Sequence, residues 1–491
     1  MDGRGAEGPG GETVQAYLDE MPVWPDGTPA GPAPLTAMQK RIWLLAAAGK
    51  FFEGLVVFMT GVALPLVHAE FGLSALQNGT VGAATLFGIL VGATTLGGLA
   101  DRFGRRTVFI AEMAVFCLFL IALTFSPGFL WLVLFLFGLG VALGGDYPTA
   151  HLIISESIPS RARGRLVLSA FGFQALGALA GTGIGYLILS SMPDLSAWRW
   201  MYATAILPAV AVVIGRLTVT ESPSWLLTRG RREEAEQAAA RLLRREPQYP
   251  TSIALKLAPP LHRKEEDGFR ALFAGRTRRA TILAAVPWFL QDLGTYGIGI
   301  FTPTILARAL GHGKDHATSI SDVIGRDIEA SQGAAFLDLL LIAGIVAAIL
   351  LADRAGRIRL QVIGFIGCAV GLLLAALSGH VGGTSQTILL FAGFMLFNFM
   401  TNMGPNAQTY LIAGEVFPTR VRGRGAGLAA SFAKLGAVAT VFLFPVLLHG
   451  VGTDVLLAIL IGTSLLGAVV TWRFRIETRG VSLESIDAHD R

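Results

Sequence analysis

The chain has 491 residues, of which 53% are hydrophobic and 15% are charged, and its formal net charge is +5. Soluble domains carry about 25% charged residues, so this composition excludes an ordinary soluble protein and indicates one that spans a membrane. The excess positive charge lies in short connections between apolar segments, so it gives no reason to expect a nucleic-acid partner.

The first 41 residues precede the first long apolar segment. They are rich in Gly and Pro and hold several acidic residues, but they lack the basic start and short apolar core of a signal peptide. We expect residues 1–41 to form a mostly disordered tail with one short helix near 12–21.

About twelve apolar segments follow, each close to the roughly 20 residues that a helix needs to cross about 30 Å of hydrocarbon. They lie at 42–67, 78–99, 107–126, 128–158, 166–190, 198–219, 279–308, 333–352, 360–378, 386–414, 425–449 and 453–473. The predicted fold is an all-α membrane protein of two six-helix bundles. The bundles are expected at 42–219 and 279–474, with a polar loop at 220–278 between them and a tail at 475–491.

Two phrases occur twice and indicate an internal duplication. ESIPSRARGR at 156–165 and EVFPTRVRGR at 415–424 share six of ten positions and begin 259 residues apart. DRFGRR at 101–106 and DRAGRIR at 353–359 begin 252 residues apart. Each phrase follows the same helix of its half, the fourth or the second, so the two halves are predicted to be repeats of one pattern.

The arginines predict the orientation of the chain in the membrane. The connections at 101–106, 161–165, 229–279, 353–359 and 420–424 are rich in Arg, whereas the short connections on the other side contain no Lys or Arg. Arg-rich loops are biased toward the cytoplasm. We therefore expect a multi-pass protein of the cytoplasmic membrane with both termini inside, and an ordered external loop at 309–332 that carries charges of both signs.

The repeated phrases place charges at helix ends. An Asp there can accept charge-assisted hydrogen bonds from nearby Arg or from the free amides of a neighbouring helix start, and such a contact can hold one conformation and release another. The alternative is that these charges only set the topology. The residues in question are Gly97, Asp101, Arg102, Gly104, Arg105, Arg106, Glu156, Arg163, Asp353, Arg354, Glu415 and Arg422.

Ionisable side chains inside apolar helices cost roughly 2.5–3.5 kcal/mol or more at the bilayer centre, so each needs a function or a partner. In the fourth helix, Asp146 and Tyr147 precede Pro148, which loosens the backbone beside them. The alternative for Asp146 is a structural tie to a neighbouring helix. Glu112, His151 and Asp338 also lie in apolar segments, and we expect structural roles for them.

In the seventh helix, Trp288, Asp292 and Tyr296 recur every four residues and share one face. An aromatic, carboxylate, aromatic stripe suits a proton-carrying acid in a hydrogen-bonding pocket, because burial and nearby cations change the charge of a carboxyl group in opposite directions. The alternative is a structural ion pair.

The tenth helix carries Asn398, Asn402, Asn406 and Tyr410 at a constant spacing of four. Gly404 and Pro405 interrupt it, as in helices whose backbone opens toward a ligand. We expect this stripe, with Asn402 and Asn406 as substrate contacts, to face a cavity. Interhelical hydrogen bonding is the alternative.

The eleventh helix contains Lys434, one of only six Lys in the chain. Its ammonium could neutralise Asp292 or Asp146, or bind an anion directly. In the first helix, Lys50 and Glu53 are three residues apart and can pair.

Residues 97–106 resemble the signature of the major facilitator superfamily, and the duplicated plan extends the resemblance over residues 42–474. The second copy is weaker, since Ile349 replaces the first Gly. TESPSWL at 220–226 resembles the sequence that ends the sixth helix in sugar-porter-like branches. The resemblance implies alternating access, in which the two halves rock about a central site.

Three further motifs resemble the phosphate:proton symporter branch: GGDYP at 144–148, WFLQD with Tyr296, and GPN at 404–406 with Lys434. The resemblance implies that a set of residues contacts substrate, namely Tyr147, Gln174, Trp288, Asp292, Tyr296 and Asn406. It implies that Asp146 and Asp292 move protons, with Lys434 as the exchanging partner. The first helix departs from the branch, because it has one acid, Glu53, where that branch has two; Glu53 is a further candidate for proton coupling.

The leading prediction is a secondary transporter, not an enzyme, that moves a small anionic or polar metabolite by proton symport, with phosphate as first substrate. Related branches that move organic acids share parts of the motifs, so an organic acid is an alternative. A facilitative uniporter and a non-transporting nutrient sensor are further alternatives. No phosphate-binding loop for ATP occurs, and we expect no cofactor, metal or nucleic acid. The expected partners of this monomer are substrate, protons and the lipid bilayer.

Overall fold

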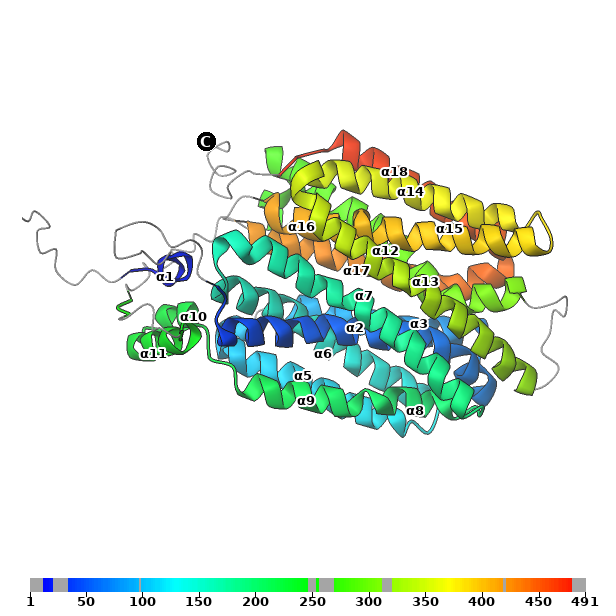
Figure 1. The fold of residues 1–491 in the computed structure, drawn as a ribbon, viewed down its shortest axis with the longest axis horizontal. Coiled ribbons are helices and arrows are strands. Elements are labelled where there is room, and N and C mark those ends of the chain that lie inside the picture. The colour runs from blue at the N-terminus through cyan, green and yellow to red at the C-terminus, as the bar shows by residue number, and fades with distance from the viewer. Residues whose placement is uncertain are drawn as a thin grey trace, which may run out of the picture.

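The computed structural model describes residues 12–20, 34–96, 99–245, 253–255, 269–310, 320–417 and 421–478. Over these residues the chain is almost entirely helical, and its one β-bridge pairs Glu12 with Leu255. The long helices run side by side, and both halves lie in one elongated bundle (Figure 1).

The first half contains α2 (Ala37–Phe71), α3 (Ala75–Leu96), α4 (Leu99–Phe103), α5 (Arg105–Thr124), α6 (Phe129–Ser157), α7 (Ser160–Ser191), α8 (Ala197–Thr204) and α9 (Ile206–Leu217). The second half contains α12 (Gly275–Leu310), α13 (Ile320–Ala355), α14 (Arg357–Ser378), α15 (Thr384–Met403), α16 (Pro405–Glu415), α17 (Arg422–Gly450) and α18 (Gly452–Arg473). Outside the halves lie α1 (Val14–Asp19), α10 (Pro223–Thr228), α11 (Arg232–Leu242) and the short 3₁₀ helix η1 (Phe269–Phe273).

Eleven described segments are long and apolar enough to cross a membrane, and α12 is a twelfth long helix among the described residues. The pairs α8–α9 and α15–α16 each count as one span. Polar residues in the middle of α12, including Gln291 and Asp292, lower its hydropathy. The structure therefore confirms the predicted all-α fold of about twelve spanning helices, six on each side of α10 and α11.

The predicted start of the eighth helix is wrong. The sequence predicts an external loop at 309–332, but α13 already begins at Ile320. Within this extension Ile324, Asp327 and Ser331 are buried at helical spacing, so one face packs against the bundle. Interspersed charged residues concealed that face in the sequence, and residues 311–319 lie outside the described part of the chain.

The predicted interruption of the tenth helix is confirmed. α15 ends at Met403 and α16 begins at Pro405, with Gly404 between them. A Cβ atom on Gly404 would lie 2.5 Å from the Cα atom of Gly364, so α14 approaches too closely for any side chain here. Proline suits the first position of α16 because its missing N–H would have no partner in the helix.

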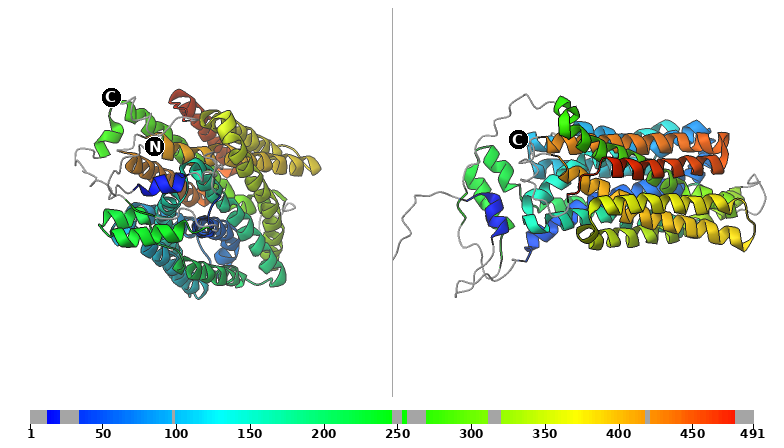
Figure 2. Two further views of the ribbon diagram at one scale, coloured as in Figure 1. Left: turned by 60° about the vertical axis from the view of Figure 1, so that its left-hand side comes forward. Right: turned by 90° about the horizontal axis from the view of Figure 1, so that it is seen from above.

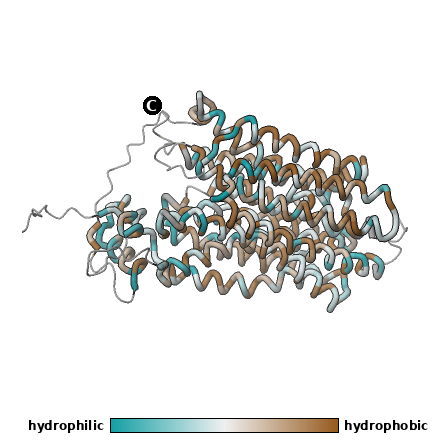
Figure 3. Tube along the Cα trace, turned by 45° about the horizontal axis from the view of Figure 1, so that its top comes forward, coloured by the Kyte–Doolittle hydropathy of each residue, from teal (hydrophilic) through white to brown (hydrophobic). Residues whose placement is uncertain are grey.

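The most extensive contacts between the halves are α3 with α17 and α7 with α13, and α2 also contacts α12. Figure 2 shows the two halves side by side along their length, with α1, α10 and α11 gathered at one end. We call this the α11 end, and the opposite one the far end. Hydrophilic residues are concentrated at the α11 end, whereas the helix surfaces along the bundle are mainly hydrophobic (Figure 3).

The predicted short helix near 12–21 is α1, and it is docked on the bundle. Asp19 accepts hydrogen bonds of 2.7 Å from both the backbone N–H and the hydroxyl of Ser160, at the start of α7. Val14 and Leu18 are buried in the same apolar cluster as Trp225. α2 begins at Ala37, five residues earlier than predicted and inside the predicted tail, whereas residues 1–11 and 21–33 lie outside the described part of the chain.

The far end is closed by backbone-to-backbone contact between the halves. A Cβ atom on Gly61 of α2 would lie 2.3 Å from the carbonyl oxygen of Ile300 in α12. A Cβ atom on Gly79 of α3 would lie 2.2 Å from the carbonyl oxygen of Phe442 in α17. Glycine at these positions therefore lets the two halves meet without side chains between them.

We predict that Gly79→Ala prevents this closure. The added methyl group cannot fit at 2.2 Å from a carbonyl oxygen, and overpacking of this kind costs about 1–3 kcal/mol. The closed population should fall roughly 5- to 150-fold.

A Gln174→Cys probe in a background without Cys117 and Cys368 should then react faster with an impermeant thiol reagent from the far side. Gly183→Ala in α7 is the matched control, because a Cβ atom there meets nothing within 4 Å. Equal labelling in both variants would contradict closure at Gly79.

Candidate functional site

Six polar side chains meet in the middle of the bundle, three from each half. We call them the central cluster: Lys50 and Glu53 of α2, Gln174 of α7, Asp292 and Tyr296 of α12, and Lys434 of α17. Glu53, Asp292 and Tyr296 are at most 3% exposed. Gly54 and Gly177 allow the backbones of α2 and α7 to touch beside Gln174, which brings the polar side chains of these two helices close together.

The Tyr296 hydroxyl joins the two halves. It accepts hydrogen bonds from Lys434 Nζ at 2.7 Å and from Gln174 Nε2 at 2.9 Å, and it donates to Glu53 Oε1 at 3.1 Å. A phenol has one donor and two acceptor sites, so these three partners use its full capacity.

The four charges of the central cluster balance. Lys50 Nζ lies 2.5 Å from Glu53 Oε2, and Lys434 Nζ lies 3.4 Å from Glu53 Oε1 and 3.5 Å from Asp292 Oδ2. Thus the predicted pairing of Lys50 with Glu53 is present. Because buried charges are costly unless paired, Lys434 is held between acids from both halves.

Two cavities of about 20 Å³ adjoin the central cluster. One is lined by Lys50, Glu53, Trp288, Asp292 and Lys434, among others, and one by Gln174, Tyr296, Asn402 and Asn406, among others. Each has room for about one water molecule. Neither cavity therefore has room for a larger ligand in this structure.

Aromatic side chains close the cavity toward the α11 end. Phe171 of α7 stacks on Tyr410 of α16 with ring centroids 4.6 Å apart, and Trp288 packs edge-on against Tyr410 at 6.2 Å. His151 Nδ1 lies 3.2 Å from the Tyr410 hydroxyl. The contacts of Tyr410 with Phe171 and His151 cross from one half to the other, so the halves meet here through side chains, unlike the backbone contacts of the far end.

The asparagines of the tenth helix have two different roles, hydrogen bonding between helices and lining of a cavity. Asn398 and Asn402 donate to the carbonyl oxygens of Leu337 and Leu341 in α13, at 3.1 and 2.8 Å, and so bond between helices. Asn406 lines both cavities and donates to Asn402 Oδ1 at 2.6 Å.

Gln291 also belongs to this region and was not singled out in the sequence. It donates to Asn406 Oδ1 at 3.1 Å and to Thr295 Oγ1 at 2.8 Å. Its place next to Asp292 on α12 was the signal that could have found it.

Asp146 lies in a separate ion pair. Arg216 Nη1 of α9 is 2.5 Å from Asp146 Oδ1, and Arg216 also donates to the carbonyl oxygens of Phe109 and Leu45. The suggestion that Lys434 neutralises Asp146 is therefore wrong in this state, and the geometry matches the structural alternative. Arg216 was missed because it lies near the end of an apolar segment, where an Arg can reach water.

The other unassigned acids also have hydroxyl partners. Glu112 Oε1 accepts from Thr149 Oγ1 at 3.1 Å, and Asp338 Oδ2 accepts from Thr182 Oγ1 at 3.0 Å. Among the described residues, no group of three or more His, Cys, Asp or Glu is placed to hold a metal ion.

In the first half, the copies of the two repeated phrases, DRFGRR and ESIPSRARGR, form a charged corner at the α11 end. Arg105 pairs with Glu156 at 3.2 Å and donates to the carbonyl oxygen of Ala100. The carboxylate of Glu221 accepts from the Arg106 backbone N–H at 3.1 and 3.2 Å, at the start of α5. Gly104 has φ 103°, a backbone conformation that residues with a side chain rarely adopt. A Cβ atom there would also lie 2.5 Å from Glu221 Oε2.

In the second half, the copies DRAGRIR and EVFPTRVRGR form the same corner. Arg357 pairs with Glu415 at 3.3 Å and donates to the carbonyl oxygen of Ala352. Glu477 accepts from the Arg357 and Ile358 backbone N–H groups at 3.0 and 3.2 Å, next to Gly356 with φ 91°. The duplication therefore extends to hydrogen bonds, including two acids, Glu221 and Glu477, that the sequence analysis missed although each follows the last helix of its half.

Some predicted residues cannot be placed. Gly97 and the side chains of Asp101, Tyr147, Asp353 and Arg422 lie outside the described part of the structure. Arg102 and Arg354 are exposed. Arg163 Nη2 donates to Gln15 Oε1 of α1 at 2.8 Å, so this signature residue contacts the N-terminal helix.

Two six-helix halves that share a buried, charge-balanced cluster define a secondary transporter built from repeats. Residues 36–489 match the family described as sugar (and other) transporter. The chain belongs to this family, and with it to the major facilitator superfamily.

Known proteins of several substrate classes are similar to the chain. The niacin transporter NiaP of Acinetobacter baylyi is 28% identical over 400 residues, covering 81% of this chain and 84% of NiaP. A Schizosaccharomyces pombe protein provisionally named as an inorganic phosphate transporter is 26% identical, covering 92% and 88%. The solved structure of the proton:xylose symporter XylE from E. coli shares the fold with a TM-score of 0.72 at 20% identity, covering 92% of this chain and 99% of XylE.

We predict that Arg216→Leu strongly destabilises the protein. It would leave the Asp146 carboxylate buried without its cation, and breaking a buried pair in this way costs about 3–5 kcal/mol. The thermal unfolding midpoint of the purified protein should fall sharply.

The control is Arg232→Leu, which breaks the solvent-exposed pair with Glu236 and should change the midpoint little. The double variant Asp146→Leu/Arg216→Leu should recover part of the loss, since no unpaired charge remains. No loss in the single variant would contradict a structural role for this pair.

Proposed function

We propose that this protein is a proton-coupled symporter of a small anion, with inorganic phosphate as the leading substrate. The observation that carries the proposal is the contact of Lys434 with acids of both halves, at 3.4 Å to Glu53 and 3.5 Å to Asp292. A passive carrier has little need of such a buried titratable cluster. The two rocking bodies would be residues 42–219 and 279–474.

The coupling follows from charge balance. When a proton neutralises Asp292, Lys434 loses one of its two counter-charges and can bind an anion in its place. When the anion leaves, Lys434 needs a carboxylate again, and the proton is released. The cluster is electrically balanced only when it holds both proton and anion or neither. We expect the two halves to close around the cluster and change their orientation only in these two states.

Several features support a small oxyanion as the substrate. The cavity already carries two ammonium groups, Lys50 and Lys434, and phosphate accepts hydrogen bonds through all its oxygens. Tyr296, Gln174 and Asn406 supply further donors at the same place. The similarity to the phosphate-named yeast protein, over 92% of this chain, points the same way.

An organic carboxylate is the second candidate. Trp288, Phe171 and Tyr410 form an aromatic surface beside the lysines, which suits a flat acid better than phosphate. Similarity to the niacin transporter NiaP supports this candidate.

The proposed location is the cytoplasmic membrane, with the α11 end and both termini in the cytoplasm. The Arg-rich corners at Arg105 and Arg357 lie at this end, in agreement with the positive-inside rule. In this orientation the far end faces outside, and the monomer contains the complete cluster.

We predict that Asp292→Asn abolishes proton-driven accumulation but retains substrate binding, because the amide cannot exchange a proton while Lys434 remains. Accumulation of labelled phosphate in proteoliposomes under an inward proton gradient should fall to the level set by equilibration. Binding to the purified variant should stay within about tenfold of wild type, equal to about 1.4 kcal/mol.

The matched control is Asp338→Asn, which changes a buried acid outside the cluster and should keep accumulation. Unchanged accumulation in Asp292→Asn would remove Asp292 from the mechanism. Unlabelled nicotinate and xylose should compete poorly if phosphate is the substrate; strong competition by nicotinate would favour the organic acid.

A further inference from the structure

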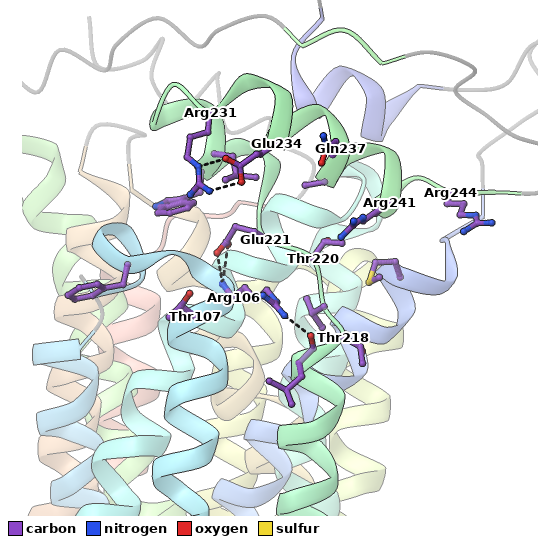
Figure 4. A pocket seen from close by; sticks show the side chains of 17 residues that line it. Arg106, Thr107, Thr218, Thr220, Glu221, Arg231, Glu234, Gln237, Arg241 and Arg244 are labelled. Atoms are coloured by element: carbon purple, nitrogen blue, oxygen red, sulfur yellow. Dashed lines mark hydrogen bonds and ion pairs between the residues drawn. The ribbon is translucent and has the colours of Figure 1, made fainter.

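A separate pocket, of about 620 Å³, lies at the α11 end, and its lining residues lie apart from the central cluster. It is enclosed by α11 on one side and by the start of α5 and the end of α9 on the other (Figure 4). None of its lining residues belongs to the central cluster, so it is not part of the proposed transport site.

Four arginines line this pocket: Arg106, Arg231, Arg241 and Arg244. Its two acids are already engaged. Glu221 accepts from the backbone N–H groups of Arg106 and Ser222, and Glu234 pairs with Arg231 at 2.5 Å. The remaining arginines therefore give the pocket an excess of positive charge.

Arg241 and Arg244 are exposed and have no hydrogen bond or ion pair with any described residue. Arg106 donates through Nη2 to the carbonyl oxygen of Leu217 at 2.7 Å, whereas its Nε is buried without a partner among the residues described. Arg241 and Arg244 thus retain their donors, and Figure 4 shows Arg244 at the edge of the pocket, apart from Arg106 and Arg241.

The sequence of α11 produces this arrangement. Glu234, Gln237 and Arg241, followed by Arg244 just beyond the helix, recur every three or four residues and line the pocket. Ala235, Ala239 and Leu242 occupy the buried face instead. α11 therefore presents one polar stripe to the pocket and one apolar stripe to the rest of the protein.

The pocket also borders the apolar surface of the bundle. Leu217 at the end of α9 is 51% exposed and Phe103 at the end of α4 is 54% exposed, and both line it. Exposed apolar side chains at a helix end of a spanning bundle lie at the boundary between hydrocarbon and headgroups. A ligand here could place a charged group among the arginines and an apolar part along α9.

We propose that this pocket binds a phosphate-bearing anion, and its position suits the headgroup of an anionic phospholipid. Guanidinium groups bind phosphate oxygens in pairs of parallel hydrogen bonds, and basic pockets at a membrane surface bind lipid headgroups. A bound phosphate group would tie α11 to the ends of α5 and α9. This inference does not depend on the substrate of the central cluster.

The test is native mass spectrometry of the purified full-length protein titrated with phosphatidylglycerol or phosphatidylcholine in the same detergent. We expect selective retention of phosphatidylglycerol. The variant Arg241→Ala/Arg244→Ala should bind it roughly 10- to 30-fold more weakly, given the contribution of each arginine at an anionic surface.

Arg232→Ala is the matched control, because it removes the same charge from the same helix but lies outside the pocket. A parallel titration with inorganic phosphate distinguishes the sources. Binding that Arg241→Ala/Arg244→Ala removes and Lys434→Ala does not would assign the pocket to a soluble phosphate. The proposal is overturned if neither probe is retained selectively, or if Arg232→Ala loses as much binding as the double variant.

Discussion

Four buried charges at the centre of an apolar bundle are the constraint on which this structure depends. Lys50 and Glu53 come from one half, and Asp292 and Lys434 come from the other. Lys434 and Asp292 form an ion pair within the second half. Lys434 also lies 3.4 Å from Glu53 of the first half, and Tyr296 donates a hydrogen bond to the same carboxylate. The relative position of the halves and the protonation of the cluster are therefore linked, because a change in one alters the electrostatic cost of the other.

The two ends of the bundle are built differently around this cluster. At the far end glycines allow the backbones of the two halves to meet, as at Gly61 and Ile300. Toward the α11 end the halves meet through side chains such as Phe171 and Tyr410. Within each half, by contrast, the corners at Arg105 and Arg357 repeat the same ion pair and the same capped helix start. Rigid corners inside each half and separable contacts between halves suit two bodies that rock as units.

Much of the fold could be predicted from the sequence, because spanning helices follow from apolar length and the repeats mark the two halves. The α12 stripe could also be predicted, since Trp288, Asp292 and Tyr296 share a face at helical spacing and all three line one cavity. The extension of α13 back to Ile320 could not be predicted, because its buried residues are interspersed with charged ones.

The partners of the buried charges could not be predicted in the same way. Arg216 lies 70 residues from Asp146, and Glu221 lies 115 residues from the amide that it caps. Such pairs form only when distant helices pack, and no local pattern records them. Lys50 shows the same limit, because its pairing with Glu53 is local but its place beside Lys434 depends on the meeting of both halves.

The central claim is that anion and proton cross together through one cluster. The most direct test loads protein-containing liposomes with a pH-sensitive dye and imposes an inward phosphate gradient without any proton gradient, with the membrane potential clamped. The account predicts that phosphate entry acidifies the interior, and that Asp292→Asn abolishes this acidification. Phosphate entry without a change in internal pH would contradict proton coupling and leave a uniporter.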